Sequence, residues 1–307
     1  MSSSPFVHGW LYFKLYPGRH VDRADALIAA AARCVQDIDP ALPWFYLRYF
    51  DATGFHLRLR VRPEAADRAA VAARLQADLQ AVLDGLPDMP PNLHQPMVLP
   101  RGAKGDPLGA LAQGKAPSLA QDDYEPEYDK YGGARGTPLA EVLFADSSRI
   151  ALALLADERA GLYDRKQLAP WLMQICFDVF KPATARRYFR QYSQFWLGGD
   201  TPAAEDWRDR FFAKARALES AGAVLLPEPQ DLPPAATRIL DDWRDALQRT
   251  RAAYVAAGRG AAAGSDVLAF NFSHLMNNRL GLSALEEAYL ATLLEHLHRT
   301  PAMEALS

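Results

Sequence analysis

Phe55-His56-Leu57-Arg58-Leu59-Arg60-Val61 alternates polar and apolar residues, and the elements on either side can be placed from this one stretch. Alternation with a period of two residues predicts a half-buried β-strand. His56, Arg58 and Arg60 share one face of that strand, where guanidinium groups are suited to carboxylates and oxyanions. An ordinary solvated strand face explains the same pattern, so the stretch alone leaves both interpretations open.

The residues around this stretch predict a βαββα order. An aromatic, alternating run over 9–16 indicates a strand, and apolar residues at helical spacing over 22–38 indicate a helix. A second strand over 44–50 leads through the turn residues 51–54 into the strand predicted over 55–61. This arrangement predicts an antiparallel hairpin. A long Ala-rich helix is expected over 64–86. This order is the beginning of a ferredoxin-like or related α+β sandwich.

Residues 87–118 are rich in proline and glycine. We expect a short strand over 95–101 and a long irregular loop over 102–117. Loops of this length inside compact domains are usually functional or mobile.

The next elements are predicted to be helical. Thr137 is expected to be the N-cap of a helix, with Pro138 in its first turn. This helix is predicted over 139–145, and Asp146-Ser147 separates it from a second apolar helix that ends at Ala156.

Beyond residue 163 nearly all of the chain shows helical periodicity. Helices are expected over 164–180, 183–196, 203–221, 233–257, 265–280 and 283–298. Gly281 has the position of a C-cap glycine, and Ser283 with Glu286 has the spacing of a capping box. We therefore expect an α+β protein with a sheet region over 1–160 and a helical region over 161–307, forming one compact domain overall.

Composition excludes several classes of protein. The net charge of −3 gives no general reason to expect direct nucleic-acid binding or an anionic membrane partner. Cys34 and Cys176 lie in apolar, helical surroundings typical of reduced, buried thiols. The first five residues lack a signal-peptide pattern, and no run approaches the ~20 apolar residues that a membrane span needs. We expect a soluble, cytoplasmic protein.

Motifs for metals, phosphates and hydrolytic nucleophiles are weak or absent in this sequence. His296 and His298 are two residues apart, off one helical face, and no cysteine pair accompanies them. The chain carries no phosphate loop, dinucleotide fingerprint or Gly-x-Ser-x-Gly elbow. We expect no metal and no cofactor.

Two further clusters could carry chemistry. Residues 124–133 combine carboxylates, aromatic residues and one lysine, and within them Glu127 and Lys130 are spaced to pair in one helical turn. Asn271, His274 and Asn278 form a polar stripe on an otherwise apolar helix. An exposed ion pair and a solvated helix face account for both clusters equally well.

Together these motifs resemble a known family: the C-terminal elimination domain of lantibiotic dehydratases and its free-standing relatives, the thiopeptide-type bacteriocin biosynthesis proteins. The shared motifs run in the family's order through nearly the whole chain. They are the aromatic strand with Lys at 10–16, the aromatic-Arg-Tyr strand at 44–50, His-x-Arg-x-Arg at 56–60, Tyr-Glu-Pro-Glu…Tyr-Gly-Gly at 124–133, Phe-Ala-Asp-Ser at 144–147 and His-x-x-x-Asn-Arg-Leu at 274–280.

The resemblance implies a reaction. In the family's elimination enzymes, a separate dehydratase subunit first glutamylates Ser or Thr of a precursor peptide, using glutamyl-tRNA. The elimination domain then expels glutamate and leaves dehydroalanine or dehydrobutyrine. Cations at the developing charges lower the barrier to such a step, and a base must take the Cα proton.

The resemblance also implies which residues act. It places catalytic roles on Arg58, Arg60, Glu127 and His274, with His274 as the base, and on Lys130, where the family has arginine. Lysine keeps the charge but loses the bidentate fork of arginine, so leaving-group recognition is expected to differ. The residues expected to bind substrate are His56, Arg48, Tyr131, Asn278 and Arg279.

Two alternatives stay open from the sequence. The family contains pyridine synthases, which join two dehydroalanines of a thiopeptide precursor by formal [4+2] cycloaddition and expel the leader peptide. The chain could instead be a non-catalytic, peptide-binding partner of a separate dehydratase. Burial of Arg58, Arg60 and His274 would favour an enzyme over such a partner. A monomer and a homodimer are equally compatible with the sequence.

Overall fold

The computed structural model describes residues 9–18, 20–51, 54–86, 116–182, 184–258 and 263–299. The chain divides into two compact units: unit 1 comprises Met1–Pro126 and Phe144–Leu152, and unit 2 comprises Glu127–Leu143 and Ala153–Ser307. The long helix α4 (Gly133–Arg159) therefore contributes its middle to unit 1 and its ends to unit 2. That the chain folds as one domain overall stays a prediction, as does the boundary at residue 160.

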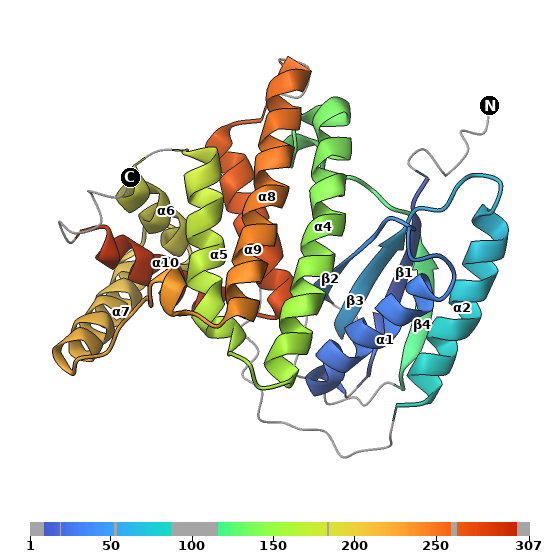
Figure 1. Ribbon diagram of the computed structural model, residues 1–307, viewed down its shortest axis with the longest axis horizontal. Helices are drawn as coiled ribbons and strands as arrows, with labels where there is room; N and C mark the ends of the chain where they lie inside the picture. The colour runs from blue at the N-terminus through green and yellow to red at the C-terminus, as the bar shows by residue number, and fades with distance from the viewer. Residues whose placement is uncertain are drawn as a thin grey trace. The chain divides into compact units, whose positions relative to one another are not determined.

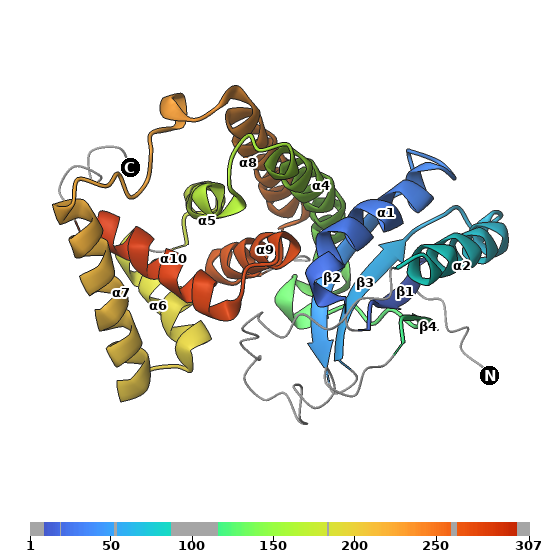
Figure 2. The same cartoon turned by 90° about the horizontal axis from the view of Figure 1, so that it is seen from below.

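Unit 1 is built on a four-stranded antiparallel sheet (Figure 1). The strands are β1 (Leu11–Tyr16), β2 (Trp44–Asp51), β3 (Gly54–Val61) and β4 (Ser118–Asp122), in the order β2-β3-β1-β4. Helices α1 (Ala24–Gln36), preceded by the 3₁₀ turn η1 (Val21–Arg23), and α2 (Arg68–Asp84) pack on one face of this sheet (Figure 2). This is the ferredoxin-like βαββαβ arrangement, which confirms the fold class expected from the sequence.

The predicted hairpin is confirmed. Strands β2 and β3 pair antiparallel, from Trp44 opposite Val61 to Asp51 opposite Gly54. Ala52 and Thr53 of the expected turn lie outside the described residues, as do the strand expected over 95–101 and most of the loop expected over 102–117.

Strand β3 differs from the half-buried strand predicted over 55–61 in one respect, because both of its faces are buried. Leu57, Leu59 and Val61 face the core beneath α1 and α2, as expected, but His56 is also 0% exposed and Arg60 only 5%. The reason is that β3 is a central strand, flanked by β2 and β1, and aromatic side chains from the neighbouring strands cover its polar face.

Strand β4 was not predicted. Its five residues, Ser118–Asp122, are mostly exposed and include one large apolar side chain, so they carry almost no alternation. The strand exists because β1 offers it a partner edge, with Lys14 opposite Ala120 and Tyr12 opposite Asp122. Sheet pairing of this kind depends on a distant segment and leaves little trace in a short local window.

Unit 2 is helical, and its predicted helices are confirmed to within about two residues. They are α5 (Arg165–Phe180), α6 (Ala185–Leu197), α7 (Pro202–Ser220), α8 (Pro234–Ala257), α9 (Ser265–Leu280) and α10 (Ala284–Leu297), with the 3₁₀ turns η2 (Tyr128–Lys130) and η3 (Pro229–Asp231). The expected caps are present, because Ser283 and Glu286 form a reciprocal capping box and Gly281 ends α9 at φ +79°.

The prediction for α4 was wrong at its start and its middle. Gly132, not Thr137, is the N-cap, and the hydroxyl of Thr137 donates to the Gly133 carbonyl oxygen inside the helix. The expected break at Asp146-Ser147 is absent from this described helix. Ser147 and Ser148 both donate to the Phe144 carbonyl oxygen, so polar side chains that favour caps are accommodated without ending the helix.

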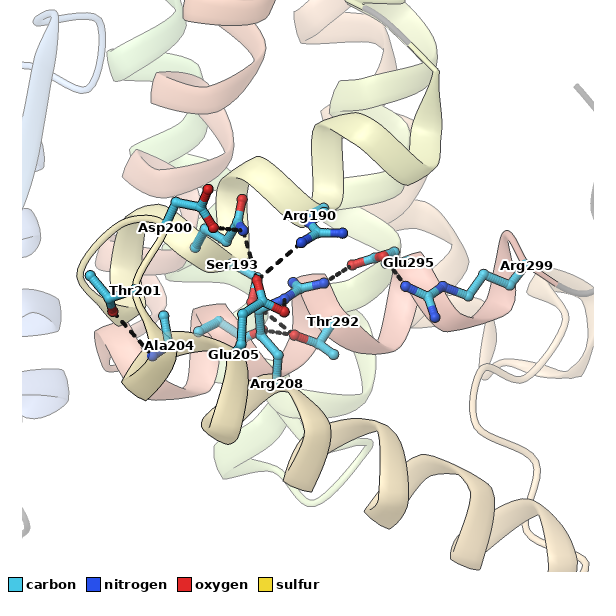
Figure 3. A network of polar contacts seen from close by, with 12 residues as sticks. Arg190, Ser193, Asp200, Thr201, Ala204, Glu205, Arg208, Thr292, Glu295 and Arg299 are labelled. Atoms are coloured by element: carbon cyan, nitrogen blue, oxygen red, sulfur yellow. Dashed lines mark hydrogen bonds and ion pairs between the residues drawn. The ribbon is translucent and has the colours of Figure 1, made fainter.

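A buried ionic network ties α7 to α10 in unit 2 (Figure 3). Arg208 is 1% exposed, and its Nη2 donates to Glu295 Oε2 at 2.5 Å. Glu295 also accepts from Arg299 at 2.5 Å, and Glu205 lies 3.6 Å from Arg208 Nε. Charges this deeply buried are tolerated only when they are paired.

No helix among the described residues is both long and apolar enough to cross a membrane.

Candidate functional site

One face of the sheet in unit 1 carries a row of cations. The register places Arg58 opposite Lys14 of β1, and Arg60 opposite Tyr12. Directly paired residues in antiparallel strands project to the same face, so Lys14, Arg58 and Arg60 lie on the face opposite α1 and α2. Lys14 forms an ion pair with Asp122 of β4.

Arg58 is held by two neighbours on this face. Its guanidinium carbon lies 3.2 Å from the centre of the Tyr49 ring, a cation–π contact. Its Nε donates to His56 Nε2 at 3.4 Å. A ring below the guanidinium and an acceptor at its edge together fix the plane of the group. Arg58 is half-buried, so it presents an oriented cation without being sealed from ligands.

His56 orients Arg58 and is too deeply buried to touch a ligand itself. Burial lowers the pKa of His56 to about 4, with the cations Arg58 and Lys14 acting in the same direction. The imidazole is therefore neutral near pH 7. Its Nδ1 lies 3.2 Å from the Gly54 carbonyl oxygen, so Nδ1 carries the proton and Nε2 is left to accept from Arg58.

Arg60 lies in a cage of aromatic rings. The centres of the Tyr12, Tyr124 and Phe45 rings are 4.5, 4.8 and 5.2 Å from its guanidinium carbon. Burial raises the pKa of the Tyr12 phenol, and the positive charge of Arg60 opposes that rise. Desolvated contacts of this kind can each be worth about 2 kcal/mol, so Arg60 also stabilises the sheet.

Arg48 lies on the other face. It is opposite Leu57 in the hairpin and forms an ion pair with Asp25 of α1. Arg48 therefore does not share the face that carries Arg58 and Arg60.

The candidate residues of unit 2 begin at Glu127 and Lys130. Lys130 Nζ donates to Glu127 Oε1 at 2.6 Å, and both side chains are about half exposed, at 48% for Lys130 and 58% for Glu127. Tyr131, next in the chain, is buried and stacks on Phe272 of α9 with ring centres 5.9 Å apart.

The backbone after Tyr131 is fixed by the Tyr254 hydroxyl and by the tight packing of Gly136 against the Tyr131 carbonyl group. The Tyr254 hydroxyl lies 3.0 Å from the carbonyl oxygens of both Tyr131 and Gly136. A Cβ on Gly136 would lie 1.8 Å from the Tyr131 carbonyl oxygen, so only glycine fits at this position.

His274 is part of a buried polar network in unit 2. Its Nδ1 lies 3.0 Å from Glu287 Oε1, and its ring packs against Trp196 with centres 4.5 Å apart. Glu287 is 1% exposed, and its Oε2 accepts from Asn277 at 3.2 Å and from the Tyr192 hydroxyl. The His274 side chain is 28% exposed, so the histidine connects this buried carboxylate to the surface of the unit.

The other polar residues of α9 that the sequence singled out are placed differently from His274. Arg279 is 1% exposed, and its Nη1 donates to the Leu275 carbonyl oxygen one turn earlier, at 2.9 Å. Asn278 is half-buried. Asn271 donates from Nδ2 to the Val267 carbonyl oxygen at 2.8 Å, so it serves its own helix.

Sequence reasoning missed Glu287, Asn277, Tyr192 and Tyr49. A signal for Glu287 was present: on α10 it shares a helical face with Ala291 and Leu294, which are both fully buried. A carboxylate on an apolar helix face indicates a buried partner. Tyr49 had no such signal, because its contact with Arg58 depends on the strand register.

No cluster of three or more His, Cys, Asp or Glu side chains suited to a metal ion occurs among the residues that the structure describes. The residues expected to be catalytic fall into two groups by unit. In unit 1 they are Arg58 and Arg60, with His56 orienting Arg58, and in unit 2 they are Glu127, Lys130 and His274.

Solved structures share this fold. The chain is similar to MibB, a tRNA-dependent lantibiotic dehydratase from Microbispora sp. 107891, with 23% identity and a TM-score of 0.63 over 97% of this chain and 29% of that chain. It is similar to TbtD, a pyridine synthase from thiomuracin biosynthesis, with 18% identity and a TM-score of 0.65 over 94% of this chain and 97% of that one. A third similar structure is TsrL, with 16% identity and a TM-score of 0.61 over 94% and 93%.

The chain thus spans less than a third of the length of MibB. No curated protein matches it. The family model described as "Lantibiotic biosynthesis dehydratase C-term" matches residues 10–298, nearly the whole sequence. The chain belongs to this lantibiotic dehydratase C-terminal family.

Proposed function

We propose that this chain eliminates glutamate from glutamylated Ser or Thr of a precursor peptide and leaves dehydroalanine or dehydrobutyrine. The observation that supports this proposal most directly is the held guanidinium of Arg58, stacked on Tyr49 and bonded to neutral His56. A cation fixed before the reaction stabilises developing negative charge without having to reorganise.

The elimination needs both a cation and a base. The Cα–H bond breaks, its electron pair forms the Cα=Cβ bond, and the Cβ–O bond electrons leave with glutamate as a carboxylate. Negative charge develops on the carbonyl oxygen beside Cα and on the leaving carboxylate. In this proposal Arg58 and Arg60 stabilise those charges, Glu127 and Lys130 recognise glutamate, and His274 takes the proton.

Burial supports an enzyme over a non-catalytic partner. Arg60 is 5% exposed, Arg58 is half-buried, and His274 is bonded to a carboxylate that is 1% exposed. A protein that only binds peptide gains little from such desolvated, oriented charges, because exposed ones attract a peptide equally well.

Pyridine synthesis is the second candidate. It is favoured by fold similarity over 97% of the pyridine synthase TbtD, and by Lys130, which stands where the family resemblance implies an arginine. Cycloaddition of two dehydroalanines has no glutamate to recognise, so it does not need a bidentate cation at that position.

Mass spectrometry separates these functions. The purified chain is incubated with a synthetic peptide whose serine is esterified by glutamate, and the molecular masses of the products are measured. Free glutamate and a peptide lighter by one water than its unmodified form support the lyase. If this peptide survives while a dehydroalanine-containing precursor loses its leader, the chain is a pyridine synthase. No change in either peptide indicates a binding partner of a separate glutamylating dehydratase.

Substitution tests the catalytic role proposed for Arg58. Arg58→Ala is expected to lower the elimination rate by about 10²–10³-fold, the usual cost of removing one charge-stabilising donor. Arg74→Ala is the matched control: Arg74 belongs to α2 of the same unit, is 60% exposed and pairs only with Asp78 one turn away among the described contacts. Equal losses in both variants would contradict the assignment.

A further inference from the structure

We infer that Glu287 is a positioning residue that makes His274 a base at its Nε2 atom. The inference rests on the proposed function and deepens it, because it adds a residue on α10 that the shared motifs do not contain. Every residue involved belongs to unit 2, on α6, α9 and α10.

Hydrogen bonding decides which nitrogen of His274 carries the proton. Oε2 of Glu287 accepts from the Asn277 amide, at 3.2 Å, and from the Tyr192 hydroxyl. Those two donors occupy Oε2, and Oε1 faces His274 Nδ1 at 3.0 Å. A carboxylate can only accept, so Nδ1 donates and Nε2 is left with its lone pair.

Tyr192 is suited to hold the carboxylate in place. Burial and the negative charge of Glu287 both raise the pKa of the Tyr192 phenol, so it keeps the proton that it donates. Asn277 is 0% exposed and lies on the same helix as His274. The carboxylate is therefore fixed from α6 and from α9, and the imidazole ring is fixed in turn against Trp196.

This arrangement matches what a base needs in the elimination. When Nε2 takes the Cα proton, the new N–H bond makes His274 an imidazolium, and its positive charge faces the carboxylate of Glu287 across 3.0 Å. The charge formed in the step is thus balanced by one already present. His274 returns to its starting form by releasing the proton to water after glutamate has left.

The titratable groups that face His274 and Glu287, among the described residues, are the phenols of Tyr192 and Tyr188, both on α6. Removing the charge of Glu287 therefore removes the main electrostatic partner of the imidazolium.

The test uses Glu287→Gln, which keeps the shape of the side chain. We expect kcat for elimination to fall by about 10²–10⁴-fold, with KM changed much less, because an amide permits the wrong tautomer. Glu287→Asp should recover part of the loss. Glu286→Gln is the matched control: Glu286 is the adjacent residue, is 36% exposed and pairs with Lys166. A glutamine there retains the capping box.

A second measurement does not need activity. Nitrogen NMR of the full-length protein with labelled histidine reports which ring nitrogen of His274 is protonated. The wild type should show Nδ1–H, and Glu287→Gln should show a mixture or Nε2–H. Tyr192→Phe, which removes one donor to Glu287, should shift the tautomer balance in the same direction by less.

The outcomes are distinguishable from a failure of the proposed function. A wild-type protein that shows the Nδ1–H tautomer but eliminates no glutamate would overturn the lyase proposal and leave the arrangement of His274 intact. A wild type that eliminates glutamate with Nε2–H on His274, or a Glu287→Gln variant as active as Glu286→Gln, would overturn the inference about Glu287.

Discussion

The Nε–H of Arg58 points at Nε2 of His56 across 3.4 Å, two residues away on the same strand. That bond is possible because burial keeps His56 neutral, with its own proton directed to the Gly54 carbonyl oxygen. A protonated His56 would lose its acceptor and would repel the guanidinium instead. The orientation of the half-buried cation thus depends on the protonation state of a fully buried imidazole.

Replacing Tyr49 tests the other support of Arg58. Tyr49→Ala should lower kcat/KM for the proposed glutamate elimination by about 2–5-fold, because a cation–π contact at an exposed site contributes about 0.5–1 kcal/mol. Tyr49→Phe keeps the ring under the guanidinium and should be nearly as active as the wild type. Steady-state kinetics of both variants provide the measurement. Equal losses in both would show that the hydroxyl, not the ring face, matters.

Stability should depend on pH through His56. Its folded pKa of about 4 lies below the ordinary 6.5, so between these values the unfolded chain binds more protons and stability rises with pH. This contribution is complete above about pH 6.5 and is lost as the pH falls toward 4. Over about 2.5 pH units it amounts to about 3 kcal/mol.

Urea unfolding at pH 4.5 and 7.5 measures that dependence. His56→Asn offers Arg58 an amide oxygen but has no titrating ring, so its stability should change less between the two pH values. An unchanged pH dependence in this variant would show that other groups, such as the buried His298, carry the effect. Burial lowers the pKa of His298 as well.

Removing the charge of Glu295 should destabilise the protein strongly. Glu295→Gln leaves Arg208 buried, with Glu205 at 3.6 Å as its nearest carboxylate among the described contacts. We expect a loss of about 3 kcal/mol in the free energy of unfolding, because an uncompensated buried charge costs about 3–5 kcal/mol. Chemical denaturation gives the value.

The matched control lies on the same helix as Arg208. Arg210 and Asp206 form a 2.7 Å ion pair one turn apart on α7, and both side chains are more than half exposed. Asp206→Asn should cost about 0–1 kcal/mol, since solvent screens exposed pairs. Similar losses for Glu295→Gln and Asp206→Asn would contradict the role given to burial.

Lys130→Arg tests whether this position recognises the glutamate leaving group. If the chain recognises glutamate at this position, restoring the bidentate fork should raise kcat/KM for the glutamylated peptide by about tenfold, the worth of one more hydrogen bond to a carboxylate. Lys130 is 48% exposed, so the melting temperature should hardly change. Lys214→Arg on α7 is the control, and an equal kcat/KM in both variants would contradict the role given to Lys130 in recognising glutamate.

Local patterns in the sequence determined most of the elements. Alternation over 55–61 and the turn residues before it predicted the hairpin, and helical periodicity placed α5 to α10 closely. These patterns are readable because each depends on neighbours a few residues apart. Where a pattern was short or mixed, as in β4 and at the start of α4, the prediction failed.

The candidate site divides in the same way. Arg58, Arg60 and His274 are carried by motifs, so the sequence by itself identified them. Only the tertiary structure decided what surrounds them: Tyr49 under Arg58 comes from strand register, and Glu287 reaches His274 from another helix. The physical reason is that burial and hydrogen-bond partners join residues distant in the chain. A local pattern can predict which residues are charged, but the folded neighbourhood determines where their protons lie.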